Sequence, residues 1–261
     1  MSKTQKELAF LRELTIESEW TERFTDYFDK KFKFDKEETV LYVNAGAGNH
    51  ALALREKLDD ETEIYAVSDN EDLQSIAQAK ADAVKADVHF GTYLPEEKSS
   101  VVIADASFVK PYELNEFLAQ VIEAADRQVA FFLPTAGSFG EIFSFLWETL
   151  LETDLLEKSE NVERLIAEIP TIEDVVEEAE KLGLKKIENS TQIEIFEYKD
   201  GAEFVNSPLL ADFLLPAWLD FLTDQEKKKA SKKLAELIDQ EDGELTFRFS
   251  VKSTLFSGEK V

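Results

Sequence analysis

The sequence predicts an α/β protein with a doubly wound, seven-stranded, mostly parallel sheet and an antiparallel last strand. Three observations carry this prediction. An apolar run over residues 40–43 enters a turn of small residues, and a helical pattern leaves that turn, which is how an open α/β sheet builds a ligand-binding turn. Further strand-like runs then alternate with helical patterns. Two late strand-like segments stand outside the alternation and predict the closing antiparallel strand.

The first part of the chain is predicted to be helical. Apolar residues recur at helical spacing over residues 4–31 and indicate one or two amphipathic helices that cover the sheet. The apolar positions are Leu8, Leu11, Leu14, Phe24, Tyr27 and Phe28. We therefore expect an N-terminal helical cover over residues 1–36 and an α/β domain over residues 37–261.

Five strands and five helices are expected after this cover, in a largely alternating order. Asn70 suits the N-cap of the second of these helices, Pro111 precedes the third, and Gly183 suits the C-cap of the fifth. The expected strands are 38–44, 63–67, 86–90, 100–105 and 128–133. The expected helices are 50–58, 71–83, 112–125, 138–156 and 172–182.

The last part of the chain changes character. Residues 186–198 and 245–256 alternate apolar and polar side chains and predict two strands. Residues 209–238 between them read as helical and form a helical insertion at about 207–240. The apolar stretch 213–222 within it suits ordinary helix packing, with a lid over a substrate pocket or a partner-docking surface as alternatives.

Composition narrows the function classes. The chain has 261 residues and a formal net charge of −26, which repels phosphate backbones and anionic membrane surfaces. We therefore expect no nucleic-acid partner. The absence of cysteine excludes disulfides and thiolate metal sites. The sequence shows neither a signal segment nor a membrane span, so this acidic protein is expected in the cytoplasm.

The small-residue turn has a chemical reason. Only small residues let a ligand approach the backbone closely, and N–H groups at the start of a helix can face an anionic group. Residues 44–48 read Asn-Ala-Gly-Ala-Gly. This turn and its flanking strand and helix resemble the first motif of class I S-adenosylmethionine-dependent methyltransferases, which have a Rossmann-like fold.

The resemblance implies S-adenosylmethionine (SAM) as the cofactor. The family's first motif has an acid near the end of the strand and then a Gly-x-Gly-x-Gly loop. In this chain Tyr42 stands where the acid is common, and Asn44 replaces the first glycine. The loop backbone would then meet the methionine part of the cofactor. The implied loop contacts are Asn44, Ala45, Gly46, Ala47 and Gly48.

The family's second motif is an acid at the end of the second strand, which binds the ribose hydroxyls. Ser68 falls on that place, and Asp69 follows it. Neighbouring strand residues point to opposite sides, so both cannot serve equally. The resemblance leaves Ser68 and Asp69 as alternatives.

Two further positions follow from the resemblance. An acid near the adenine is implied after the third strand, where Asp87 is one candidate. An alignment anchored on residues 94–95 places Phe90 there instead. Asp105 lies in the loop that the family places under the transferring methyl group.

The resemblance implies methyl transfer to a small or apolar acceptor and identifies no catalytic residue. His50 and His89 are the only histidines, and without acids at ligand spacing they predict no metal site. The alternative is a catalytically inactive module that binds a ligand, a protein partner or a second copy. Tyr42, Asn44 and Ser68, which replace usual contact residues, motivate that alternative.

Overall fold

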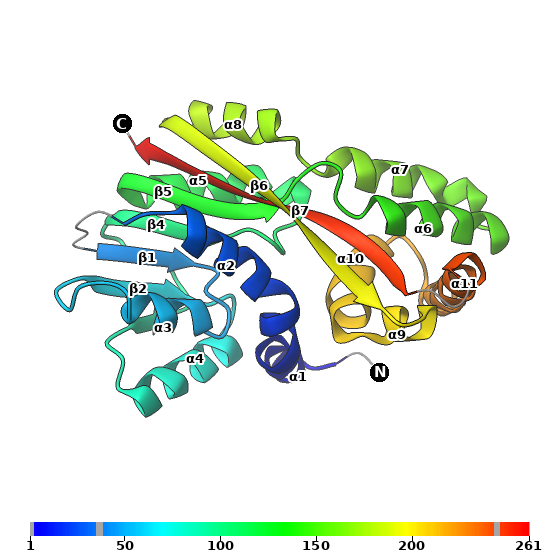
Figure 1. Cartoon of the computed structure of the whole chain (residues 1–261), viewed down its shortest axis with the longest axis horizontal. Helices are drawn as coiled ribbons and strands as arrows, with labels where there is room; N and C mark the ends of the chain where they lie inside the picture. Colours follow the sequence, from blue (N-terminus) through cyan, green and yellow to red (C-terminus); the bar gives the residue numbers. More distant parts are fainter. Residues whose placement is uncertain (1–2, 35–38, 243–245, 261) are drawn as a thin grey trace. The chain divides into compact units, whose positions relative to one another are not determined.

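The computed structural model describes residues 3–34, 39–242 and 246–260 (Figure 1). The chain separates into two compact units. Unit 1 comprises Met1–Leu133, Thr171–Gln192 and Ser253–Val261, and unit 2 comprises Pro134–Pro170 and Ile193–Lys252. The predicted domain boundary at residues 36–37 lies outside the described residues, as do the predicted strand ends at residues 38 and 245.

A seven-stranded sheet has the order β3-β2-β1-β4-β5-β7-β6. Strands β1 to β5 pair in parallel, and β7 is antiparallel to its neighbours, so the predicted fold class is confirmed. The strand order reverses between β1 and β4, where the carboxyl ends of the strands form a ligand-binding crevice in such sheets. The strands are β1 (Thr39–Val43), β2 (Glu63–Val67), β3 (His89–Gly91), β4 (Ser99–Asp105), β5 (Ala125–Pro134), β6 (Leu184–Tyr198) and β7 (Phe247–Lys260).

The core of unit 1 forms on both faces of the central strands. Strand β4 is buried along almost its whole length, as its continuous apolar run requires in a sheet covered on both sides. On one face Leu41, Val102 and Phe131 pack with residues of the covering helices. The helices of this unit that follow β1 are α3 (Asn49–Arg55), α4 (Glu71–Val84), η2 (Pro111–Glu113), α5 (Leu114–Glu123) and α8 (Ile172–Lys181).

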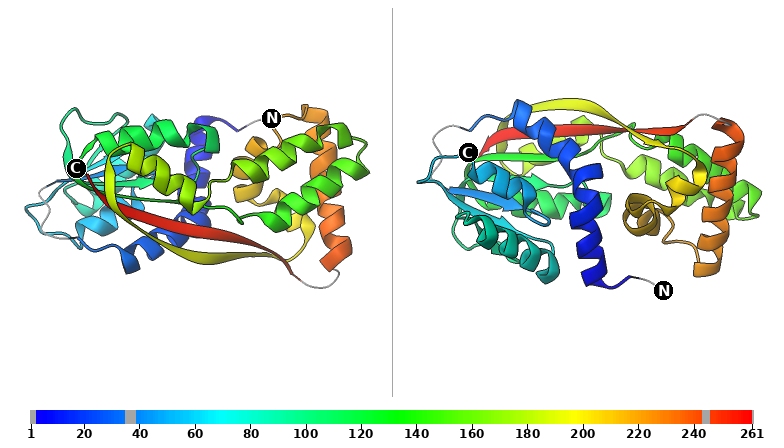
Figure 2. Two further views of the ribbon diagram at one scale, coloured as in Figure 1. Left: turned by 90° about the horizontal axis from the view of Figure 1, so that it is seen from above. Right: turned by 60° about the horizontal axis from the view of Figure 1, so that its bottom comes forward.

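Three consecutive helical segments precede β1. They are α1 (Gln5–Leu11), η1 (Arg12–Thr21) and α2 (Glu22–Lys31), and η1 is a π-helix. Figures 1 and 2 show these blue segments passing the arrowhead end of β1. Phe24, Tyr27 and Phe28 are buried as predicted. Leu14 is 75% exposed, so its predicted place on the apolar face is wrong.

The π-helix explains that error. Its hydrogen bonds join residues five apart, as the bond from the Glu22 N–H to the Glu17 carbonyl shows. A helix with this bonding turns less per residue than the α-helix on which the apolar spacing was read. Side chains of η1 therefore point away from the faces that a period of 3.6 predicts.

Unit 2 contains mainly helices, together with parts of β6 and β7. The predicted helix over 209–238 is interrupted after residue 218, and Trp218 packs against Phe139 and Phe143 at ring-centroid distances of 5.0 and 5.2 Å. The apolar stretch is thus used for packing, as predicted. The helices are α6 (Gly140–Glu152), η3 (Leu156–Lys158), α7 (Ser159–Glu168), α9 (Gly201–Asn206), η4 (Leu209–Leu214), α10 (Leu215–Trp218) and α11 (Asp224–Asp242).

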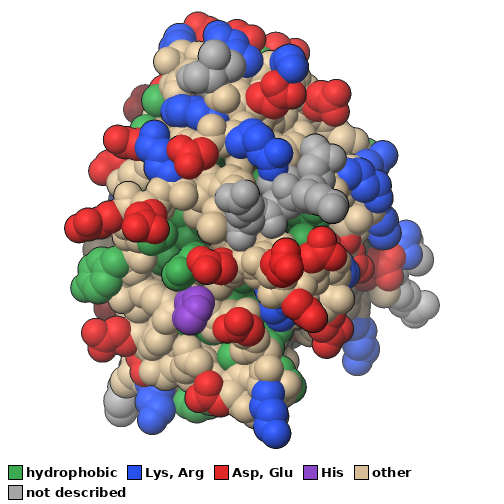
Figure 3. All heavy atoms as spheres, turned by 90° about the vertical axis from the view of Figure 1, so that its left-hand side faces the viewer, with side chains coloured by type: hydrophobic (Ala, Val, Ile, Leu, Met, Phe, Trp, Pro, Cys, Tyr) green, Lys and Arg blue, Asp and Glu red, His purple; other side chains and the backbone are tan. Residues whose placement is uncertain are grey.

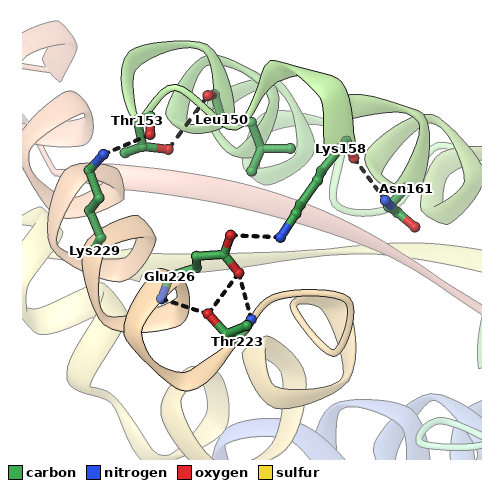
Figure 4. Close-up of polar contacts among 7 residues, drawn as sticks. All are labelled: Leu150, Thr153, Lys158, Asn161, Thr223, Glu226 and Lys229. Carbon is green, nitrogen blue, oxygen red and sulfur yellow. Dashed lines mark hydrogen bonds and ion pairs between the residues drawn. The ribbon is translucent and has the colours of Figure 1, made fainter.

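The restart of the helix at α11 has a clear local cause (Figure 4). The Glu226 N–H donates to the Thr223 hydroxyl, and the Thr223 N–H donates to the Glu226 carboxylate at 2.8 Å, which is a reciprocal capping box. Lys158 also donates to Glu226 at 2.7 Å. The hydrogen bonds from Lys158 and Thr223 lower the pKa of Glu226 to about 2.

The charged side chains are dispersed where they are visible. On the face in Figure 3, acidic side chains are spread over the surface together with basic ones, and the coloured residues form no continuous basic surface. None of the helices within the described ranges combines the length and apolar character needed to cross a membrane.

Candidate functional site

The loop between β1 and α3 is held in a left-handed conformation. Asn44, Gly46 and Gly48 have φ angles of 56°, 56° and 83°. Asparagine tolerates this region better than most residues because its short amide can hydrogen-bond locally. Here the Asn44 amide donates to the Asp105 carbonyl at 3.0 Å, so the replacement of the first glycine keeps the loop conformation and links the loop to β4.

The two glycines of this loop have different surroundings. A Cβ at Gly48 would lie 2.7 Å from the Phe90 ring and 2.9 Å from the Cβ of Ala77. A Cβ at Gly46 would meet only the Arg12 side chain, at 3.7 Å or more. Gly48 is therefore required by packing, whereas Gly46 presents its backbone to the space that Arg12 occupies.

Ser68 and Asp69, the two candidates at the end of β2 for binding the ribose, have different contacts in the structure. Ser68 is buried, and its hydroxyl donates to the Gly46 carbonyl at 2.8 Å. The Asp69 carboxylate accepts a hydrogen bond from the Arg12 guanidinium and keeps 26% of its side chain exposed. Ser68 thus supports the loop, and Asp69 is joined through Arg12 to the side of the loop that Gly46 presents.

Asp87 and Phe90, the two candidates near β3 for the adenine side of the site, lie in different places. Asp87 is exposed and lies two residues before the first residue of β3, whereas the site lies at the carboxyl ends of the strands. Phe90 packs against Gly48, and the Gln74 amide donates to the Phe90 carbonyl at 3.1 Å. The structure brings Phe90, and not Asp87, to the loop.

Asp105 joins the site from the end of β4. Its carboxylate is buried and accepts the Ser107 N–H at 2.7 Å. Burial raises the pKa of Asp105, and the positive charge of Arg12 opposes that rise. The Trp20 indole donates to the Ser107 hydroxyl at 3.0 Å, so the end of β4 is tied to η1.

Three residues of η1, namely Arg12, Glu17 and Trp20, contribute to this site and were not predicted. Glu17 is buried, and burial together with the negative charge of Asp105 raises its pKa to about 7. Arg12 and Glu17 are five residues apart, and the π-helical bonding brings such residues toward one face. The only signal in the sequence is an arginine and a glutamate at this spacing, which an α-helical period places on different faces.

A second polar chain lies behind the loop. The Tyr42 hydroxyl, in the place of the family's acid, is 3.0 Å from Nδ1 of His50, and Nε2 of His50 is 3.1 Å from Asp29. Burial raises the pKa of Tyr42 well above its usual value. Although burial opposes it, hydrogen bonds from His50 and Lys57 lower the pKa of Asp29 to about 2. These hydrogen-bonded side chains join α2 to α3, so Tyr42 has a structural role.

The two histidines lie apart. His50 is buried in α3, whereas His89 is exposed at the start of β3 and stacks on Tyr65 at 5.2 Å. Over the part of the chain that the structure describes, no three His, Asp or Glu side chains gather as metal ligands.

The raised pKa of Glu17 predicts a pH-dependent stability. A carboxyl with a higher pKa in the folded state favours folding when protonated. The contribution is complete below about pH 4.5 and is lost as the pH rises to about 7. Glu17→Gln should remove this loss and make the variant more stable than the wild type at pH 8, by up to about 3 kcal/mol.

Urea denaturation at several pH values measures this effect. Glu22→Gln, which changes an exposed carboxyl at the start of α2, is the matched control and should leave the pH profile unchanged. A parallel profile for wild type and Glu17→Gln between pH 4.5 and 7 would contradict the assignment.

Solved structures with the same architecture are numerous. The YcgJ protein of Bacillus subtilis has a TM-score of 0.57 at 13% identity, over 91% of this chain and 98% of that chain. A SAM-dependent methyltransferase from Thiobacillus denitrificans, solved with S-adenosylhomocysteine, has a TM-score of 0.56 at 10% identity, over 100% of both chains. A SAM-dependent methyltransferase from Geobacter sulfurreducens with the same ligand has a TM-score of 0.55 at 10% identity, over 100% of this chain and 99% of that one.

Sequence comparison gives no further relatives: no protein-family model and no curated protein matches the chain. At the identities of the structural neighbours the likeness establishes the fold, which is the fold of class I SAM-dependent methyltransferases.

Proposed function

We propose that this chain binds SAM and transfers its methyl group to a small or apolar acceptor. The observation that carries the proposal is the left-handed loop of residues 44–48, which follows β1 at the reversal of strand order. Arg12 lies near Gly46 and joins this loop to Asp69. The reversal of strand order is the position at which open α/β sheets bind ligands. The structural neighbours solved with S-adenosylhomocysteine support the same assignment.

The residues around Gly46 fit a cationic cofactor. The guanidinium that now lies there is itself a cation, and its Nε is buried without a hydrogen-bond partner among the described residues. In the proposed complex the backbone of residues 44–48 would hold the methionine part. Asp69 would hold the ribose hydroxyls, and Phe90 would border the adenine.

Bound SAM would supply a methyl group on a reactive sulfonium, so the chain's own residues mainly have to position the acceptor. Aromatic side chains surround the end of β4: Trp20 lies 5.1 Å from Phe24 and 5.3 Å from Phe108 between ring centroids. Their apolar surface supports an apolar acceptor. The proposal includes a small-molecule acceptor. It also includes a cytoplasmic location, which the lack of cysteine favours.

A second candidate function is a catalytically inactive binding module. Arg12, which pairs with Asp69 and lies near Gly46, favours it, because the protein's own side chain then takes the place proposed for the cofactor. Tyr42 and Ser68 support it as well, since both are committed to structural hydrogen bonds. A measurement of SAM binding is the first experiment that distinguishes the two candidate functions.

Calorimetric titration with SAM tests the proposed site. Asp69→Asn should weaken binding roughly tenfold or more, because hydrogen bonds to a charged carboxylate contribute about 1.5–3 kcal/mol. Asp87→Asn, a matched change at an exposed carboxyl apart from the loop, should leave the dissociation constant unchanged. Equal effects of both variants would refute the site, and no binding by folded wild type at millimolar SAM would favour the inactive module.

A further inference from the structure

The surroundings of the Arg12 guanidinium suit a cation. Its central carbon lies 5.3 Å from the centroid of the Phe108 ring, a distance at which a cation is attracted to an aromatic face. One nitrogen donates to the Asp69 carboxylate. The negative charges of Asp105 and Glu17 also act on it. One aromatic ring and the Asp69 carboxylate thus contact the guanidinium, and two further buried carboxyl groups act on its charge.

The same surroundings do not satisfy a guanidinium. This group has five N–H donors, and the Nε donor of Arg12 is buried with no hydrogen-bond partner within the described residues. This nitrogen lies near Gly46, where a Cβ would be 3.7 Å away. A buried donor without an acceptor destabilises the arrangement that contains it. A sulfonium carries the same charge and has no N–H donor, so it would leave none unpaired here.

The segment that carries Arg12 has more exposed apolar side chains than the segment that follows it. Ala9 of α1 packs into a small cluster with Ala47 and Leu73, while Phe10 and Leu14 are 48% and 75% exposed. Eight residues beyond Arg12, Trp20 is completely buried. Displacement of the Arg12 side chain would therefore leave the Trp20 attachment of η1 in place.

We propose that the Arg12 guanidinium is an internal stand-in for the sulfonium of SAM. The two cations exchange at one site beside Phe108, Asp105 and Glu17, and Asp69, once released from Arg12, takes the ribose hydroxyls. This inference rests on the proposed function. Exchange of this kind would make the site select ligands that carry a positive charge. The site should prefer SAM to S-adenosylhomocysteine, which is a neutral thioether, because a neutral ligand that displaces Arg12 leaves the carboxyl groups without a counter-charge.

The test compares the dissociation constants of SAM and S-adenosylhomocysteine by calorimetry. Wild type should bind SAM roughly tenfold more tightly than S-adenosylhomocysteine. A factor of this size is expected when a cation lies on an aromatic ring at a site that excludes water. Arg12→Met keeps the apolar stem and removes the competing charge, so it should raise the affinity for SAM about tenfold. Arg12→Lys keeps a competing cation and should stay near the wild-type affinity for SAM.

The outcomes separate this inference from the proposed function. Weak SAM binding by wild type with tight binding by Arg12→Met would support the exchange. Equal affinities for the two ligands in wild type, or unchanged SAM affinity in Arg12→Met, would overturn it while leaving cofactor binding in place. Absence of SAM binding in wild type and both variants would overturn the proposed function itself. The comparison in wild type needs no substitution and stands if a variant fails to fold.

Discussion

Replacing Gly48 by alanine is expected to lower the free energy of unfolding by about 3 kcal/mol. Two physical costs combine at this position. A side chain at a φ of 83° costs about 1–2 kcal/mol. The new Cβ would lie 2.7 Å from the Phe90 ring and 2.9 Å from Ala77, and forcing such a contact in a packed core typically costs 1–3 kcal/mol.

Gly46→Ala is the matched control for this substitution. It carries the strain of a φ of 56°, but its Cβ would meet only the flexible Arg12 side chain at 3.7 Å. The expected loss is therefore about 1 kcal/mol. Urea denaturation of the two variants measures the difference, and equal losses would show that Gly48 does not have the tight contact with Phe90 described here.

The second large effect is expected at Trp20. Trp20→Ala should destabilise the protein by about 4 kcal/mol, as for other buried tryptophans. The indole is completely buried, packs against Phe24 and Phe108, and donates to Ser107. Its removal should also loosen η1, which carries Arg12 and Glu17, from the end of β4.

Trp20→Phe separates the hydrogen bond from the packing. Phenylalanine keeps most of the aromatic contact and loses the N–H donor, so the expected loss in thermal or urea denaturation is smaller than for alanine, about 1–2 kcal/mol. If both substitutions cost the same, the Ser107 hydrogen bond and not ring packing holds η1 in place.

The sheet and its loop were predictable because their signals are local. An apolar run, a turn of small residues and a helical pattern recur with the period of each element, and residues 40–54 fold as the sequence indicates. The helix starting after Asn70 was also predicted, since the Asn70 side chain caps it by accepting the Leu73 N–H at 3.0 Å. Neighbouring residues in the sequence decide such features.

The N-terminal part of the site was not predictable in the same way. Arg12 reaches Asp69 across 57 positions of sequence, and it does so from a π-helix whose period differs from the one used to read the pattern. The choice between Ser68 and Asp69 likewise depends on where β2 ends. The structure ends β2 at Val67, which directs Ser68 to Gly46 and leaves Asp69 for Arg12.

Hydrogen–deuterium exchange with and without saturating SAM tests the central claim most directly. The claim is that the cofactor and Arg12 use the same place beside Gly46 and Asp69. We predict slower exchange in the loop of residues 44–48 and at residues 68–70 when SAM binds, together with faster exchange in α1 and η1 as Arg12 leaves Asp69. Unchanged exchange in the loop at millimolar SAM would contradict cofactor binding there, and slower exchange in α1 and η1 would contradict the displacement of Arg12.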